Sequence, residues 1–267
     1  MIIIGELING TRKAIKAAIA ARDADFIADL AKKQEEAGAT FIDCNPGTTG
    51  ADEVTDMEWL VNTVQSVVKA PISFDSPNPL AIERALEVYK GDKTPMINSI
   101  TFEDEKIASM LPLVASSGCN VVALALGDDG MPCVGGQRQT TACRLIDKLT
   151  ASGVAADKIY LDPVIAPLST QAETGGHVLA AIEAVKKHSP ATHVTCGLSN
   201  ISFGLPNRKL LNRVFVSLCM VAGLDSAIMD PLDAQIMATV FAAEALLGRD
   251  EWCMNYITAS RAGKLEV

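Results

Sequence analysis

The stretch Phe41-Ile42-Asp43-Cys44-Asn45 decides the fold, because an apolar run ends there in polar side chains and the same pattern recurs along the chain. Six further runs stop at Asp or Asn in this way, at residues 2–9, 72–75, 96–98, 159–162, 194–200 and 227–230. An eighth run, 121–126, is followed by Gly127-Asp128-Asp129-Gly130. Short runs rich in Ile, Val and Leu are typical of parallel strands that helices cover.

Segments with helical periodicity lie between these runs. In residues 23–38, Asp23 is suited to cap a helix, apolar residues recur at helical spacing, and Gly38 stands where a helix would stop. Comparable patterns occur at about 52–68, 79–89, 103–117, 138–152, 176–188, 207–222 and 232–246. The sequence therefore predicts eight strand–helix units in succession.

The spacing of these units indicates how they assemble. We expect strand ends near residues 4, 43, 75, 98, 126, 162, 197 and 228. The spacing between successive strand ends fits the roughly 30 residues of a βαβ unit. Eight units in 267 residues favour an α/β protein with one domain, 1–267, folded as a (β/α)8 TIM barrel. An open dinucleotide-binding sheet would need Gly-x-Gly-x-x-Gly after the first strand, which Gly5-Glu6-Leu7-Ile8-Asn9-Gly10 does not supply.

Composition and charge exclude several classes of protein. A formal charge of −9 without a Lys/Arg cluster argues against nucleic acid or an anionic membrane as partner. No apolar stretch approaches the ~20 residues of a membrane span, and the N-terminus lacks the basic start of a signal peptide, so we expect a cytoplasmic protein. The seven cysteines form no Cys-x-x-Cys pair and are expected to be reduced thiols.

The polar residues that end the runs are the candidate site, because a TIM barrel carries its site at the C-terminal ends of the strands. They are Asn9, Asp43, Asn45, Asp75, Asn98, Asp162, Asn200 and Asp230. The alternative for each one is a capping role in the turn that follows. Asp and Asn dominate all these positions, where Ser, Thr or Gly would also serve as caps, and this favours a shared function.

Residue types that are missing from these positions narrow the chemistry. No Lys ends a strand, which argues against a Schiff-base aldolase. His193 begins a strand, on the face opposite the site, and His177 is expected at the start of a helix. We expect no metal in this chain, although a Mg²⁺ site of Asp43, Asp75 and Asp162 stays open as an alternative. The glycine pair in Val134-Gly135-Gly136-Gln137 is more typical of a turn than of a phosphate site.

Carboxylates and amides at a barrel mouth suit a flat ligand with several N–H donors. A carboxylate accepts two parallel hydrogen bonds from an amino-pyrimidinone edge, and an amide beside it both donates and accepts. Pterins and purines present that edge. The residues alone therefore predict a barrel that binds a polar heterocycle.

Six strings at successive strand ends resemble a known family. They are Gly5-Glu6-Leu7-Ile8-Asn9, Ile42-Asp43-Cys44-Asn45-Pro46-Gly47, Phe74-Asp75-Ser76, Met96-Ile97-Asn98-Ser99, Tyr160-Leu161-Asp162-Pro163 and Gly197-Leu198-Ser199-Asn200-Ile201-Ser202. Together they resemble the pterin-binding methyltransferases and, more narrowly, the methyltetrahydrofolate:corrinoid protein methyltransferases of anaerobic bacteria. The resemblance covers about residues 1–258.

The resemblance implies roles for individual residues. Asp75, Asn98 and Asp162 would hold the pyrimidine edge of the pterin, and Asn200 would hydrogen-bond N5, the atom that exchanges the methyl group. The other residues implied at the mouth are Gly197, Ser199, Ser202, Phe203 and Arg208 as folate contacts, and Asn9, Asp43 and Asn45 as polar residues around them. Some family members are polar near Phe203, so this ring either stacks on the folate or closes the loop.

The resemblance also implies the reaction and its partners. The methyl group would move by direct displacement between N5 of tetrahydrofolate and the cobalt of a corrinoid (cobalamin), in either direction. A hydrogen bond from Asn200 would stabilise the charge that develops at N5, and alignment would supply much of the rest. The barrel uses the whole chain, so the corrinoid would arrive on a separate protein that docks over the strand ends. The family resemblance further suggests a homodimer.

Two other functions compete with this one. A dihydropteroate synthase would share the barrel and the pterin edge, but it needs basic residues late in the barrel, where this chain reads Ser226-Ala227-Ile228-Met229-Asp230-Pro231. A folate-binding barrel without turnover would share the binding residues but would not need Asn200.

Overall fold

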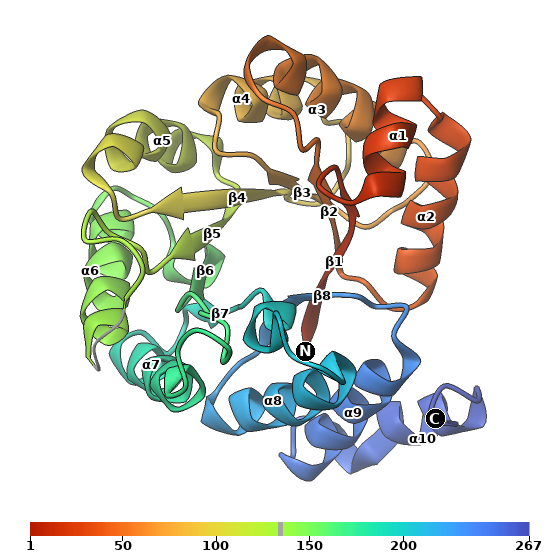
Figure 1. Ribbon diagram of the computed structural model, residues 1–267, viewed down its shortest axis with the longest axis vertical. Coiled ribbons are helices and arrows are strands. Elements are labelled where there is room, and N and C mark those ends of the chain that lie inside the picture. Colours follow the sequence, from red (N-terminus) through yellow and green to blue (C-terminus); the bar gives the residue numbers. More distant parts are fainter. Residues whose placement is uncertain (133–135, 267) are drawn as a thin grey trace.

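The computed structural model describes residues 1–132 and 136–266 and has eight parallel strands surrounded by helices (Figure 1). The strands are β1 (Ile2–Asn9), β2 (Phe41–Asn45), β3 (Ile72–Asp75), β4 (Met96–Thr101), β5 (Asn120–Leu124), β6 (Ile159–Asp162), β7 (His193–Val194) and β8 (Ser226–Met229). Their order in the sheet is β7-β6-β5-β4-β3-β2-β1-β8. Sequence neighbours are therefore spatial neighbours, as in the predicted (β/α)8 barrel, and β1 pairs with β8, the first strand of the chain with the last.

The helices form an outer ring around the strands (Figure 1). They are α1 (Lys13–Ala21), α2 (Ala24–Glu36), α3 (Gly50–Gln65), α4 (Pro79–Val88), α5 (Asp104–Ser117), α6 (Gln137–Ala151), α7 (Thr174–His188), α8 (Arg208–Ala222), α9 (Ala234–Leu246) and α10 (Met254–Arg261), with short 3-10 segments η1 (Ala156–Lys158), η2 (Leu198–Ser202) and η3 (Glu251–Cys253). The eight predicted helices are confirmed. Asp23 caps α2 by accepting from the Phe26 amide.

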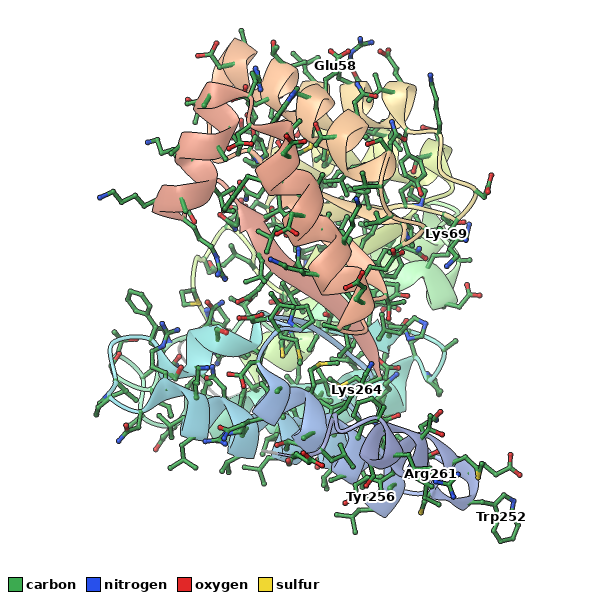
Figure 2. All side chains as sticks on the ribbon, turned by 90° about the vertical axis from the view of Figure 1, so that its right-hand side faces the viewer. Glu58, Lys69, Trp252, Tyr256, Arg261 and Lys264 are labelled. Atoms are coloured by element: carbon green, nitrogen blue, oxygen red, sulfur yellow. The ribbon has the colours of Figure 1, made fainter. Side chains whose placement is uncertain are left out.

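Two helices were not predicted from periodicity. Helix α1 lies between β1 and α2, where the sequence suggested one helix, and α10 follows the last strand–helix unit. Figure 2 shows the end of the chain, with Tyr256, Arg261 and Trp252, projecting at one corner of the molecule. Trp252 is 83% exposed there. In the described residues no helix is both long and apolar enough to cross a bilayer.

The last gap in the barrel is closed differently from the others. Strand β7 has only two residues and pairs with β6, while a single bridge, Gly197 to Ile228, joins its continuation to β8. The amide of Ile228 donates to the carbonyl of Cys196 across this gap at 2.9 Å. The strand predicted to end near residue 197 is therefore shorter than expected, because its ladder stops at Val194 and a single bridge remains at Gly197. The chain turns into η2 at Leu198, where the Asn200 amide bonds the Gly197 carbonyl.

The core explains why the strand ends carry the site. Within the barrel, Phe41, Met96 and Tyr160 pack with Ile4 and Val122 in a buried apolar cluster. Alternate residues of a strand point the same way, so the residues two places later, Asp43, Asn98 and Asp162, form the next layer towards the strand ends. The polar site thus stands directly on an apolar floor.

Candidate active site

Four predicted side chains form one connected cluster on β2, β3 and β4. Asn45 donates from Nδ2 to Asp75 Oδ2 at 2.8 Å, and Asn98 donates from Nδ2 to Asp43 Oδ1 at 3.2 Å. The β2–β3–β4 register sets these pairs, because Asp75 lies opposite Asn98 and Ser73 lies opposite Asp43. Since the Asn98 amide nitrogen is held by Asp43, its oxygen is directed elsewhere and can accept a ligand N–H.

The two carboxyl groups of this cluster share a hydrogen bond and behave differently. Burial, and next the charge of Asp75, raise the pKa of Asp43 well above its usual range. Burial also raises the pKa of Asp75, but hydrogen bonds from Asn45 and Asp43 oppose this rise. The pKa of Asp43 is raised more strongly than that of Asp75, so Asp43 is the donor in their shared hydrogen bond and Asp75 the acceptor.

Asp162 stands alone at the end of β6 and is 6% exposed. Its Oδ1 accepts from the Val164 amide at 2.7 Å and its Oδ2 from the Gly197 amide at 3.3 Å. Burial raises its pKa to about 6, while the two backbone donors oppose this rise. Asp162 is thus mainly ionised at neutral pH, and each oxygen has a second lone pair for a ligand.

The segment η2 and the start of α8 form the opposite rim of the mouth. Arg208 donates from Nη2 to the Ser199 carbonyl at 2.8 Å and from Nε to Ser202 Oγ at 3.1 Å, so it ties α8 to η2. Asn200 is exposed. Among the hydrogen bonds of the described residues, none involves its side chain. Phe203 is 63% exposed with the Arg208 guanidinium 5.7 Å from its ring centre, so it does not close the loop as a buried apolar residue.

Asn9 and Asp230 cap the turns that follow their strands. This capping role was the alternative to a site role for every polar residue that ends an apolar run. Asn9 Oδ1 accepts from the amide and hydroxyl of Thr11, and Asp230 Oδ1 accepts from the Leu232 amide. Asn45 combines both roles, because its Oδ1 accepts from the Gly47 amide while its nitrogen holds Asp75. A capping role and a site role therefore coexist in one set of residues.

Sequence reasoning missed a second part of the mouth, beside the start of α8. A cavity of about 360 Å³ is lined there by Glu6, Arg12, Ser199, Arg208, Lys209, Asn212, Met229, Asp230, Asp233 and Ile236. Glu6 pairs with Arg12 at 3.0 Å, and burial raises the pKa of Glu6. Glu6 lies inside β1 and not at its tip, so a search for residues that end strands could not find it.

A buried acid outside the mouth supports the same loops. Glu53 of α3 accepts from Ser76 Oγ at 2.6 Å and from Asn78 Nδ2 at 3.1 Å. The Ser76 amide in turn donates to the Asn98 carbonyl. Glu53 therefore holds the turn after β3, which Ser76 joins to β4. The sequence pattern does not reveal this role of Glu53, because the role depends on a contact between distant elements.

The histidines lie where the sequence predicted. His193 begins β7, stacks on Tyr160 and contacts Asp225, far from the strand ends, while His177 is in the first turn of α7 beside Glu173. Among the residues that the structure describes, no three His, Cys, Asp or Glu side chains form a metal-binding group. Of the string Val134-Gly135-Gly136-Gln137, Val134 and Gly135 lie outside the described residues, as does Cys133, while Gly136 directly precedes α6. The six described cysteines are free thiols.

The comparisons with known proteins fit this geometry. A family model described as "Pterin binding enzyme" matches residues 5–230, which include every strand end named above. The chain belongs to this family. Among curated proteins, the chain is similar to the methylcorrinoid:tetrahydrofolate methyltransferase of Eubacterium limosum, which is 38% identical over 99% of this chain and 98% of its own length.

More distant relatives share part of their length or only the fold. Methionine synthase of Mycobacterium tuberculosis is 34% identical over 86% of this chain, which corresponds to 20% of that longer protein. The solved dihydropteroate synthase of Vibrio fischeri superposes with a TM-score of 0.68 at 18% identity, covering 92% of this chain and 93% of its own. The dihydropteroate synthase of Xanthomonas albilineans in complex with 7,8-dihydropteroate superposes with a TM-score of 0.68 at 17% identity, covering 94% of this chain and 93% of its own. These two structures establish the barrel fold.

Proposed function

We propose that the protein is a methyltransferase that moves a methyl group between N5 of tetrahydrofolate and the cobalt of a corrinoid carried by a separate protein. The observation that carries the proposal is the end-to-end similarity to the Eubacterium limosum enzyme, at 38% identity. The name of that enzyme describes transfer from a methylcorrinoid to tetrahydrofolate. The arrangement of acceptors at the mouth supports the same substrate.

The pterin edge is held by three acceptors in this proposal. Asp162 offers a carboxylate with two lone pairs free, Asp75 offers the oxygens of a carboxyl group that Asp43 and Asn45 donate to, and Asn98 offers its amide oxygen. A pyrimidine edge presents N–H donors in one plane, which match this set. Asp43, Asp162 and Asn98 are only 3%, 6% and 7% exposed, and this burial strengthens the hydrogen bonds because little water competes.

Asn200 acts at the reacting nitrogen in this proposal. For transfer towards tetrahydrofolate, the N5 lone pair forms the new N–CH₃ bond, the electron pair of the methyl–cobalt bond stays with cobalt, and the N5 proton is released. Asn200 accepts from or donates to N5 as its charge changes, without giving up a proton of its own. Gly197 and Ser199 shape the loop, and Arg208 holds it through Ser199 and Ser202.

The rim of the mouth is suited to a protein that delivers the corrinoid, which supplies or takes the methyl group. Three apolar side chains that follow separate strands are exposed there: Leu80 at the start of α4 at 63%, Phe203 after β7 at 63% and Leu232 after β8 at 42%. Exposed apolar residues around a polar site are typical of a protein-binding rim. Asn200, three residues before Phe203, is also exposed.

The reaction can be followed by the methyl–cobalt absorbance. We expect the purified protein, mixed with tetrahydrofolate and methylcobalamin or a methylated corrinoid protein, to remove that absorbance and to form 5-methyltetrahydrofolate in equal amount. The reverse assay uses 5-methyltetrahydrofolate and reduced cobalamin. If neither direction proceeds with any corrinoid but tetrahydrofolate still binds, the protein is a folate-binding barrel and the proposed reaction is wrong.

We further propose that two copies of the chain pair through α8. Leu210, Val214, Leu218 and Val221 recur every three or four residues along this helix and are 48–70% exposed, so they form one apolar stripe. A twofold contact places the same helix on both sides. In an antiparallel pair, Lys209 near the start of each α8 would face the negative, C-terminal end of the other.

This dimer is tested by sedimentation equilibrium. The wild-type protein is expected to sediment as a dimer at micromolar concentration, and the double variant Val214→Glu, Leu218→Glu as a monomer, because charges would be buried at the contact. Phe26→Glu on α2, where Phe26 is 42% exposed, is the matched control and should stay dimeric. A monomeric wild type, or a dimeric double variant, would contradict the contact.

A further inference from the structure

Val164, two residues after Asp162, has an unusual backbone conformation that side chains hold from both sides. Its φ is 60°, in the left-handed region that a β-branched residue rarely adopts. Its amide donates to Asp162 Oδ1 at 2.7 Å, and its carbonyl accepts from Arg138 Nε at 3.1 Å. Both polar groups of this residue are therefore fixed by side chains.

Arg138 is placed to hold this loop and not merely to touch it. The residue lies in the first turn of α6 and is 1% exposed. Its Nη2 donates to Gln171 Oε1 at 3.1 Å and to Thr174 Oγ1 at 3.4 Å. Thr174 begins α7 and is fully buried. One planar guanidinium thus joins α6, the loop after β6 and the start of α7.

The connection continues from Val164 to the mouth. With Oδ1 on the Val164 amide and Oδ2 on the Gly197 amide, the plane of the Asp162 carboxylate is determined. Gly197 also accepts from the Asn200 amide. A shift of Val164 would therefore turn the Asp162 carboxylate and loosen the loop that carries Asn200.

We infer that Arg138 is a positioning residue for folate: by holding Val164 in its left-handed conformation, it orients the Asp162 carboxylate towards the ligand. The inference rests on the proposed function, because it assumes that Asp162 binds the pterin edge. Arg138 itself lies beneath the mouth and acts through Val164. Its loss leaves Val164 free to return to a common conformation, so that its amide leaves Asp162.

The charged groups around Asp162 allow a test by pH. Strand β5 presents no titratable side chain, and the Cys196 thiol that follows β7 stays neutral, because burial raises its pKa well above the usual range. His193 at the start of β7 bonds Asp225. On α6, besides Arg138, Arg144 lies over the Phe102 ring and Asp147 pairs with His188. The Val164 amide lowers the pKa of Asp162, so its departure should raise it.

The experiment compares Arg138→Lys and Arg138→Met with wild type and with Arg249→Lys. Arg249 is a matched control, because it also donates to two backbone carbonyls, those of Leu224 and Met220, but away from the strand ends. Tetrahydrofolate binding is measured by calorimetry from pH 5 to 8, with the thermal midpoint recorded for each variant. Arg138→Lys keeps the charge but replaces the planar fork that donates from Nε and Nη2 by a single nitrogen, which makes it the milder change if Arg138→Met folds poorly.

We expect the Kd for tetrahydrofolate to rise roughly tenfold in the Arg138 variants, and the pH midpoint of binding to move above that of wild type. Arg249→Lys should lower the thermal midpoint without changing either quantity. If wild type binds tetrahydrofolate and the folded Arg138 variants bind it with unchanged Kd and pH midpoint, the inference is wrong. If wild type does not bind tetrahydrofolate at all, the proposed function is wrong instead.

Discussion

Replacing Asn200 with alanine is expected to slow methyl transfer by roughly 10²-fold, the typical effect of losing one donor that stabilises charge in a transition state. Asn200 is exposed at the rim, on a loop whose backbone is held by Gly197 and Arg208. The pterin edge, by contrast, is assigned to Asp75, Asn98 and Asp162. Removing the Asn200 amide should therefore change the Kd for tetrahydrofolate much less than the turnover.

The measurement pairs single-turnover methyl transfer with equilibrium binding of tetrahydrofolate. Asn200→Asp is the informative companion, because it keeps the shape of the side chain and removes its N–H donors. A slow Asn200→Asp enzyme would indicate that donation to N5 matters, whereas a fast one would indicate acceptance. If Asn200→Ala weakens binding by the same factor as it slows transfer, the role given to Asn200 is refuted.

Asp162→Ala is expected to have the opposite pattern, with a roughly 10²-fold weaker Kd for tetrahydrofolate and a smaller change in the rate at saturation. Two charge-assisted hydrogen bonds to the ligand would be lost, each contributing about 1.5–3 kcal/mol. Part of that loss is offset, because the variant no longer desolvates a carboxylate. Equal losses in Kd and rate, or a loss in rate alone, would contradict the assignment of Asp162 to binding.

The same carboxylate predicts the pH dependence of binding. The pKa of Asp162 is raised to about 6, mainly by burial, and the ionised form is the one that accepts two N–H donors. Affinity should therefore be full above this value and fall as pH drops through about 6, approaching tenfold for each further unit. Burial also raises the pKa of Asp75, so Asp162→Asn is the control. The difference between its pH profile and that of wild type is the part of the pH dependence that Asp162 contributes. A profile that is flat between pH 5 and 8 in wild type would contradict this prediction.

The sequence predicted the strand–helix order because burial leaves a strong periodic signal. It predicted the tips Asp43, Asp75, Asn98 and Asp162 because each ends an apolar run, and in three strands an apolar interior residue, such as Phe41 before Asp43, precedes the tip by two places. Hydrogen bonds between distant elements leave no such signal. The pairing of Asp43 with Asp75 and the support of Ser76 by Glu53 depend on the register between strands and helices, so only the folded chain reveals them.

Asn200 illustrates a different limit of sequence reasoning. The run that ends there is apolar enough to be read as a strand, but Gly197 and the polar residues after it bend the chain into a 3-10 segment. The resemblance named the residue as part of a motif, and its role stays a prediction, whereas periodicity placed it at the end of a strand and not in η2. Motif and local geometry were therefore independent sources of information at this position.

The single bridge that closes the barrel between β7 and β8 also gives the molecule an uneven resistance to local opening. Seven neighbouring strand pairs share ladders, but Gly197 and Ile228 make one bridge, and little backbone bonding must break for that seam to fluctuate. The loop bearing Asn200 begins at this seam, while Asp75 and Asn98 sit on the firmly laddered side. In the proposed function, the firmly laddered half would hold the pterin edge through Asp75 and Asn98, and the adaptable half would carry Asn200 to the methyl group.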